Sequence, residues 1–237
     1  MKTILATIFL SLIFSLPAFA DGTLTHLSGE VSVAKADGTK VPASVGLEVL
    51  SGETVITGDN GYARLEMSDG GEMLIRQDSQ LKIESYRFDK DKPTEDSALF
   101  RVIKGGFRTL TGLISKRGNK DAYQVRTSTA TIGIRGTQYD LRLCQANCGT
   151  LPDGTYVAVR YGEVAVDNPQ GSQNFTAGQV GFAGNNQPPV ALPRDPGVGF
   201  KAPPDFPKLE KKTPETGDKT SNSSTGQDDN AANCSVQ

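Results

Sequence analysis

The sequence has no tryptophan, a single histidine and only three cysteines among its 237 residues. Three cysteines are too few for a disulfide scaffold, so a hydrophobic core must hold the fold together. A folded region of about 160 residues is long enough for one such core, since a domain of that size buries about 70% of the surface of its unfolded chain. A metal site would need more ligands than the lone His26 supplies. We therefore expect no metal.

Catalytic motifs are missing as well. The sequence contains no Gly-x-Ser-x-Gly, no phosphate-binding glycine loop and no His-Glu-x-x-His. The carboxylates of Asp59, Asp69 and Asp153 fall in predicted turns, where aspartate is favoured for backbone reasons. These absences predict a protein that is not an enzyme and that carries no cofactor.

The sequence also lacks a large excess of either charge. After removal of Lys2 with the leader described below, 24 basic residues stand against 27 acidic ones, a formal charge of −3. A nucleic-acid-binding surface would show a clustered basic patch, so we expect no nucleic-acid partner.

Long apolar runs are confined to the N-terminus. A short positive start, Met1-Lys2, precedes the apolar run Ile4 to Leu16 and the small-x-small pattern Ala18-Phe19-Ala20. This pattern is typical of a cleavable signal peptide, here residues 1–20, with cleavage between Ala20 and Asp21. No later segment reaches the ~20 apolar residues that a transmembrane helix needs. The sequence predicts a periplasmic or secreted protein whose mature chain has no transmembrane segment.

The folded part, residues 21–184, reads as β-structure. Short alternating segments rich in β-branched residues are interrupted every eight to twelve residues by Gly, Asp or Asn, and no stretch keeps a helical period. We expect a single all-β domain of many short strands, either sandwich-like or jelly-roll-like or coiled as a β-solenoid. The strands expected most clearly span residues 30–34, 53–57, 62–67, 72–76, 80–87, 98–103, 106–114, 123–127, 156–160, 163–166 and 179–182.

The alternation changes phase within residues 129–143. Apolar residues occupy even positions up to Ile134 and odd positions from Tyr139 onwards. Side chains alternate across a strand, so one flat strand cannot place both sets on the same face. The chain must bulge, bend or change sheets near Arg135-Gly136, and we assign structural roles to Gly133 and Gly136.

Arg135 lies at this corner and allows two interpretations. Its guanidinium could satisfy carbonyls freed where the strand ladder breaks, or it could contact a partner or an anionic ligand. Thr127, Thr129 and Thr131 would share one strand face, either as a half-exposed β-branched surface or as a polar groove. Arg135 and Thr127, Thr129, Thr131 and Thr137 are our candidate binding residues.

Cys144 and Cys148 are four residues apart in a loop between two predicted strands. In an oxidising compartment this close pair predicts a small-loop disulfide. Cys234 has no evident partner and could be a free thiol or an intermolecular link. The polar loop 89–96 resembles a calcium loop only in part, because Pro93 and Thr94 replace the ligand and glycine of that motif, so a solvated hairpin loop is favoured.

Composition changes after Gly184. Residues 185–237 hold eight of the thirteen prolines and only two aromatic residues, Phe200 and Phe206, and they end in a run rich in Ser, Asn, Asp, Thr and Gly. Such a segment buries too little apolar surface to offset chain entropy, so we expect a disordered tail.

An ordered series of short motifs resembles the FecR domain family. The motifs are Gly29-Glu30-Val31, residues 50–58, residues 61–65, Asp69-Gly70, Gly105-Gly106, residues 125–127 and residues 132–137. The resemblance extends over roughly residues 23–182. It implies an extracytoplasmic β-rich module that is not an enzyme. The chain departs from the family pattern at Glu53, where aspartate is usual, and after Thr127, where proline is usual.

In the family's regulators, such a module passes a signal from an outer-membrane receptor to an inner-membrane anti-sigma segment. Here a signal peptide precedes the module, and no transmembrane helix is evident. The resemblance therefore favours an exported binding or sensing module, an adaptor or soluble partner of an envelope signalling protein such as a membrane sensor or receptor. A structural envelope protein that binds glycan or peptidoglycan is the alternative, although the absence of tryptophan weakens it.

Overall fold

The computed structural model describes residues 20–117, 119 and 121–209. The predicted signal peptide, except Ala20, and Cys234 lie outside these residues. Apart from a single 3₁₀ turn, η1 (Pro93–Glu95), every regular element of the described chain is a strand, which confirms the all-β prediction. The strands are β1 (Gly22–Ser28), β2 (Val31–Ala34), β3 (Lys40–Pro42), β4 (Glu48–Val49), β5 (Thr54–Thr57), β6 (Tyr62–Met67), β7 (Glu72–Ile75), β8 (Ser79–Arg87), β9 (Ser97–Leu110), β10 (Tyr123–Arg126), β11 (Thr131–Cys144), β12 (Gly154–Asn168), β13 (Gly171–Thr176), β14 (Val180–Ala183) and β15 (Val190–Leu192).

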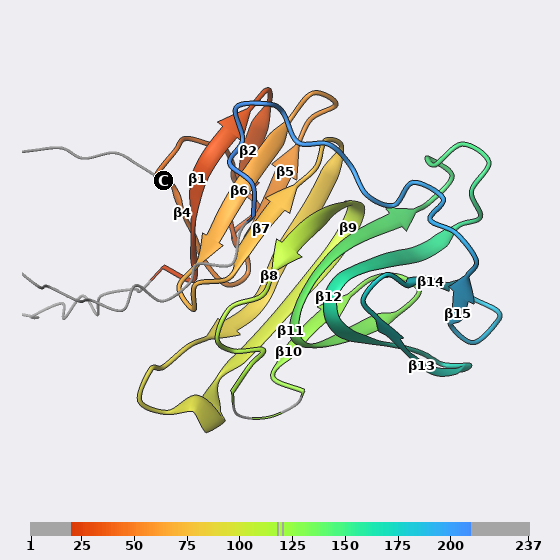
Figure 1. The fold of residues 1–237 in the computed structure, drawn as a ribbon. Coiled ribbons are helices and arrows are strands. Elements are labelled where there is room, and N and C mark those ends of the chain that lie inside the picture. The colour runs from red at the N-terminus through yellow and green to blue at the C-terminus, as the bar shows by residue number, and fades with distance from the viewer. Residues whose placement is uncertain (1–19, 118, 120, 210–237) are drawn as a thin grey trace, which may run out of the picture.

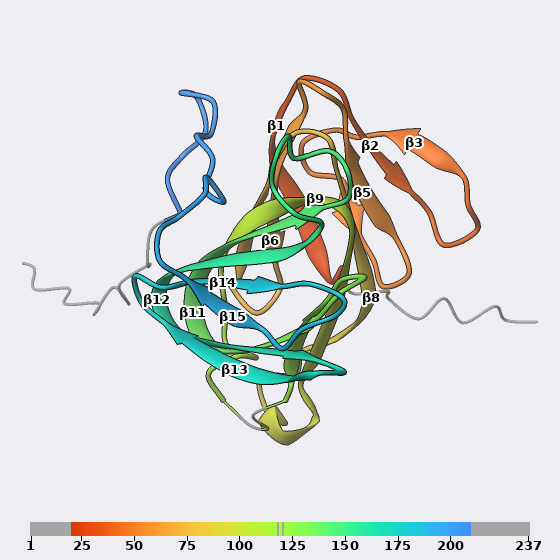
Figure 2. The same cartoon turned by 90° about the vertical axis from the view of Figure 1, so that its right-hand side faces the viewer.

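All the strands belong to one sheet, which folds over so that two layers enclose a common core (Figures 1 and 2). The first layer holds β1, β4, β6, β7, β14 and β15, and the second holds β2, β3, β5, β8, β10 and β13. The long strands β9, β11 and β12 run through both layers. β9, for example, pairs with β8 along residues 97–104 and with β7 along residues 107–110. Of the two arrangements left open by the sequence, the structure is the sandwich-like one.

The core lies between the layers and follows the period-2 pattern of the strands. Leu65, Ile75 and Phe107 enter it from the first layer, and Phe100 and Ile132 enter it from the second. Side chains on successive positions point to opposite faces, so each layer also has an outer face. These two outer faces differ in character, as described below.

The long strands cross between layers at glycines with left-handed backbone, Gly105 (φ 74°), Gly136 (φ 63°) and Gly162 (φ 81°). The β11–β12 register shifts between Arg135 and Gln138, and both apolar sets of β11, represented by Ile132 and Tyr139, are fully buried. The predicted bulge at Arg135-Gly136 is therefore confirmed. Glycine tolerates this backbone at little steric cost, so each strand continues through the corner where a larger residue would be strained.

This geometry explains why two long strands were each predicted as a pair of shorter ones. Residues 98–103 and 106–114 were expected as separate strands because Gly105-Gly106 interrupts the alternation. In the structure they join in β9, which ends at Leu110. Residues 156–160 and 163–166 join in β12 in the same way, across Gly162.

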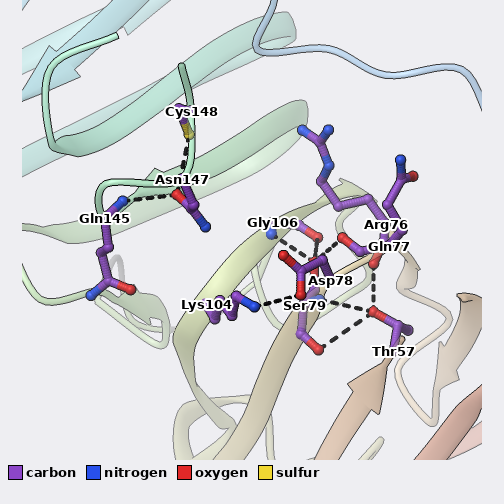
Figure 3. A network of polar contacts seen from close by, with 10 residues as sticks. All are labelled: Thr57, Arg76, Gln77, Asp78, Ser79, Lys104, Gly106, Gln145, Asn147 and Cys148. Carbon is purple, nitrogen blue, oxygen red and sulfur yellow. Dashed lines mark hydrogen bonds and ion pairs between the residues drawn. The ribbon is translucent and has the colours of Figure 1, made fainter. Parts of the chain in front are cut away.

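A polar network fixes the β7–β8 turn to the corner of β9 (Figure 3). The Ser79 hydroxyl donates to the Gly106 carbonyl at 3.1 Å and accepts from the Gly106 amide at 2.9 Å. The Thr57 hydroxyl donates to the Arg76 carbonyl at 2.6 Å and accepts from the Ser79 amide at 3.0 Å. These bonds satisfy backbone groups that the bend would otherwise leave unpaired.

The loop after β11 carries the predicted disulfide. Cys144 and Cys148 are bonded, with their Cα atoms 5.5 Å apart. The Asn147 side chain accepts from the Gln145 amide at 3.0 Å and closes the same small loop (Figure 3).

The first part of the expected tail packs on the domain. Residues 190–192 form β15 against β14, and Val198 and Phe206 are 1% and 7% exposed. Residues 185–209 are therefore attached to the domain, because a few apolar side chains in this proline-rich segment find buried positions on it. The rest of the expected disordered tail, residues 210–237, lies outside the described residues.

We predict that Gly105→Ala destabilises the protein by about 3 kcal/mol, because the left-handed backbone and a steric clash both oppose a Cβ atom. A Cβ atom at this position would lie 2.2 Å from the Ser79 hydroxyl oxygen. Gly38→Ala is the matched control, since its φ is also positive but nothing lies within 4 Å, and it should cost about 1 kcal/mol. Urea unfolding measures both. Equal losses would contradict the clash.

Buried tyrosines predict an alkaline transition. Burial raises the pKa of Tyr123 and Tyr139 well above the ordinary value. A phenol whose pKa is higher in the folded state gives stability that is complete below pH about 10 and is lost as the pH rises further. We expect the phenolate absorbance of these residues to appear together with loss of the β-sheet circular dichroism signal. Their ionisation in a fully folded protein would contradict this expectation.

Candidate functional site

The outer face of the second layer brings together several candidate residues predicted from the sequence. Outward side chains of β10, the first half of β11, the second half of β12, and β13 form this surface, which we call the hollowed face. Strand pairing places Gln124 beside Gly133, Gly133 beside Ala165, and Ala165 beside Asn174 in one row across four strands. The alternate residues, such as Ile132 and Val164, point into the core.

The centre of this row lacks bulky side chains. Gly133 and Ala165 form the floor of a hollow of about 380 Å³. Its other lining residues are Asp121, Gln124, Thr131, Ile134, Arg135, Glu163, Asp167 and Asn174. Three carboxylates against one guanidinium give this hollow a formal charge of −2. Its size and polar rim suit one inserted side chain, either an amide or a basic group.

Arg135 is exposed at the rim of the hollow. Within the part of the chain that the structure describes, its guanidinium makes no hydrogen bond and no ion pair. The Cα partner of Arg135 across the β11–β12 ladder is Glu163, which instead accepts a hydrogen bond from Asn174 at 2.6 Å. The reading of Arg135 as a tie for freed carbonyls is therefore not what the structure shows. Its donors face solvent.

Thr127, Thr129 and Thr131 do not share a strand face, contrary to our expectation. β10 ends at Arg126, and residues 127–130 form a turn in which the Thr127 hydroxyl accepts from the Ala130 amide at 2.9 Å. Such local side-chain bonds compete with the strand ladder and end it. The hydroxyls of Thr127 and Thr129 also lie 2.7 Å from that of Thr155, so both hold the turn against β12.

The turn nevertheless lines a second hollow of about 440 Å³ that adjoins the first, because both share Thr131 and Asp167. Arg101 and Arg126 lie at this end of the face, and both form ion pairs with Glu84. The hollowed face is therefore acidic beside Glu163, whereas the arginines beside Thr127 are balanced by carboxylates.

Thr137 is not available for binding. It is 1% exposed, its amide donates to the Thr111 hydroxyl at 2.9 Å, and its carbonyl accepts from the Thr111 amide at 3.0 Å. Thr137 is thus part of the corner. Gly136 has the left-handed backbone expected of a structural glycine, whereas Gly133 does not. A Cβ atom added at Gly133 would have the side chain of Ala165 as its nearest neighbour, at 3.9 Å.

The loop 89–96 is arranged as a turn. The Asp96 carboxylate accepts from the Asp89 amide at 2.9 Å and pairs with Arg117, so these contacts occupy the oxygens that a metal ion would need. Among the described residues, no three His, Cys, Asp or Glu side chains are grouped as ligands for a metal ion. In residues 20–117, 119 and 121–209, no helix is long and apolar enough to cross a membrane.

Comparisons with known proteins can now be set beside this geometry. The family model described as "FecR protein" matches residues 53–165, which confirms the resemblance seen in the motifs. The matched region includes β9–β11 and ends within β12, at Ala165 on the floor of the hollow. Among curated proteins, none matches the sequence.

Two crystal structures of a proposed anti-sigma factor from Parabacteroides distasonis resemble the fold. They are 15% and 16% identical in sequence, with a TM-score of 0.45 for each. The similarity covers 59% of this chain and 58% of theirs, so the chain spans less than two thirds of either relative. At this level the likeness carries no argument about function.

We predict that Arg135→Ala changes the free energy of unfolding by less than about 0.5 kcal/mol, since exposed residues without partners contribute little. The matched control is Arg117→Ala, which removes the ion-pair partner of the buried Asp96 and should cost roughly 3 kcal/mol. Chemical denaturation of both variants measures the difference. A comparable loss for Arg135→Ala would show that Arg135 supports the corner.

Proposed function

We propose that this protein is an exported binding or sensing module of the FecR type that works as an adaptor or soluble partner in cell-envelope signalling. The FecR match supports a signalling-related, regulatory role. The observation that carries the proposal is the hollowed face, where an unpaired Arg135 stands beside a hollow floored by Gly133 and Ala165. A hollow with free donors and carboxylates on a rigid sheet is suited to recognition of another protein.

The geometry supports a protein partner with defined chemistry. One basic or amide side chain of the partner enters the acidic hollow, and Arg135 donates to a carboxylate or carbonyl beside it. Tyr161 lies on β12, two residues before Glu163, the ladder partner of Arg135, and is 53% exposed. Tyrosine and arginine are the residue types most often responsible for affinity at such interfaces.

The compartment is part of the proposal. The leader pattern of residues 1–20 supports export to the periplasm or beyond, with a mature chain that begins at Asp21. The disulfide between Cys144 and Cys148 agrees with an oxidising compartment. A membrane sensor or receptor in the envelope is the partner that we propose.

Two variants test this site without disturbing the fold. Arg135→Ala removes the free donors, and Gly133→Val fills the hollow at a position with room for a side chain and without left-handed backbone. We expect each variant to keep the melting temperature within about 2 °C. We also expect each to recover at least about tenfold less partner than the wild type, as loss of a central contact implies.

The measurement is crosslinking in the periplasm with the mature chain as bait, followed by mass spectrometry. Recovery of an envelope sensor or receptor by the wild type, and its loss in both variants, would support the proposal. Equal recovery by the wild type and both variants would refute the assignment to the hollowed face. Recovery of wall fragments alone, with retention of the protein on sedimented cell-wall sacculi, would favour the glycan-associated alternative.

A further inference from the structure

The outer face of the first layer is covered by the chain itself. Residues 197–209, which we call the strap, run from β14 back towards β1 and β6 (Figure 1). Val198 packs against Tyr156 and Phe182 at one end, and the Phe206 ring lies 6.2 Å from the ring of Tyr62 at the other. We call the surface beneath it the strapped face. It is the outer side of the first layer, and the core-facing side chains of the same strands lie on the inner side.

Arginines on three different strands hold the strap by its backbone. Arg142 donates to the Gly197 carbonyl at 3.4 Å, Arg108 to the Phe200 carbonyl at 2.9 Å, and Arg64 to the Pro207 carbonyl at 3.3 Å. A guanidinium has donors and no acceptor. The strapped face therefore presents donors along its length.

The strap has the matching chemistry. Pro203, Pro204 and Pro207 have no amide hydrogen, so this segment offers carbonyl acceptors in excess of donors. The Phe200 ring lies between the guanidinium groups of Arg76 and Arg108, 5.3 Å and 5.1 Å from its centroid. Grooves that recognise proline-rich peptides bind them in the same way, through side-chain donors to the peptide carbonyls and through contacts with aromatic rings.

The strap does not fill this face. Between Phe200 and Phe206 it arches over a cavity of about 490 Å³, with Leu74, Gln138 and Arg160 among the residues on the sheet side. A buried nitrogen of the Arg76 guanidinium, Nη1, has no hydrogen-bond partner among the described residues. The face has room and donors that its present occupant does not use.

The strap and the face beneath it carry net charges of the same sign. Five arginines of the face, 64, 76, 108, 142 and 160, stand against three carboxylates, 66, 72 and 140, which leaves two positive charges. The strap adds one more, because Lys201 and Lys208 exceed Asp205. Like charges across an interface oppose binding, so an acidic segment of the same backbone type would bind more tightly.

We propose that the strapped face is a binding groove for an extended, proline-rich, acidic segment of a partner protein, and that residues 197–209 are an intramolecular occupant that such a segment displaces. The groove lies on the opposite layer from the hollowed face. Its test is therefore independent of the proposed function.

The test uses the full chain and two labelled peptides, one with the sequence of residues 197–209 and one with glutamate in place of Lys201 and Lys208. The released variant, Phe200→Ala with Phe206→Ala, removes both aromatic anchors of the strap. By fluorescence anisotropy we expect the released variant to bind either peptide at least about tenfold more tightly than the wild type, since the groove is no longer occupied. The acidic peptide should bind more tightly than the native one, and added salt should reduce the difference.

Matched arginine variants locate the site. In the released variant, Arg76→Gln with Arg142→Gln should weaken peptide binding at least about tenfold, whereas Arg126→Gln on the opposite layer should leave it unchanged. A folded released variant that binds neither peptide would overturn the proposal, as would equal effects of the two sets of arginine variants. Dimers of the wild type formed by exchanged straps would assign the groove to a second copy and overturn the partner assignment.

A second measurement covers the case in which the released variant does not fold. Hydrogen exchange of wild-type residues 198–206 should increase when the acidic peptide is present in excess, because the displaced strap loses its protection. Unchanged exchange at saturating peptide would overturn the proposal.

Discussion

The structure depends on a line of three left-handed glycines where the long strands turn from one layer to the other. Gly105, Gly136 and Gly162 each have a positive φ, and an added Cβ at Gly162 would lie 2.8 Å from the Gly136 carbonyl oxygen. The glycines of neighbouring strands β11 and β12 are thus fitted to each other. Because β9, β11 and β12 bend together without a break, one sheet supplies both sides of its own core.

This bend also creates two different outer faces. In the second layer, the outward positions beyond the corner include Gly133 and Ala165, which leave a hollow beside the exposed Arg135. In the first layer, the outward positions include Arg108 and Asp140, whose charges are partly buried under the strap. One face is open and one is covered, and the same three strands contribute to both.

Much of the fold follows from local pattern, and much of the site does not. The phase change between Ile134 and Tyr139 predicts the corner because side-chain alternation is a local property. The face shared by Gln124, Gly133, Ala165 and Asn174 depends on strand pairing, which alternation alone does not reveal. Thr127 and Thr129 were placed on a strand because threonine favours strands, yet their hydroxyls bond locally and end it. Residues 185–209 looked like a tail because their apolar residues are few, but two of those few, Val198 and Phe206, are buried on the domain.

The central claim is that the hollowed face receives a protein partner. Its most direct test is site-specific photocrosslinking in the envelope, with the photoreactive residue at Gln124 on the rim of the hollow and, as control, at Val45, which is 65% exposed outside it. The account predicts a discrete crosslinked partner from position 124 that is absent from position 45 and is lost when Gly133→Val fills the hollow. No crosslink from position 124, or the same product from both positions, would contradict it.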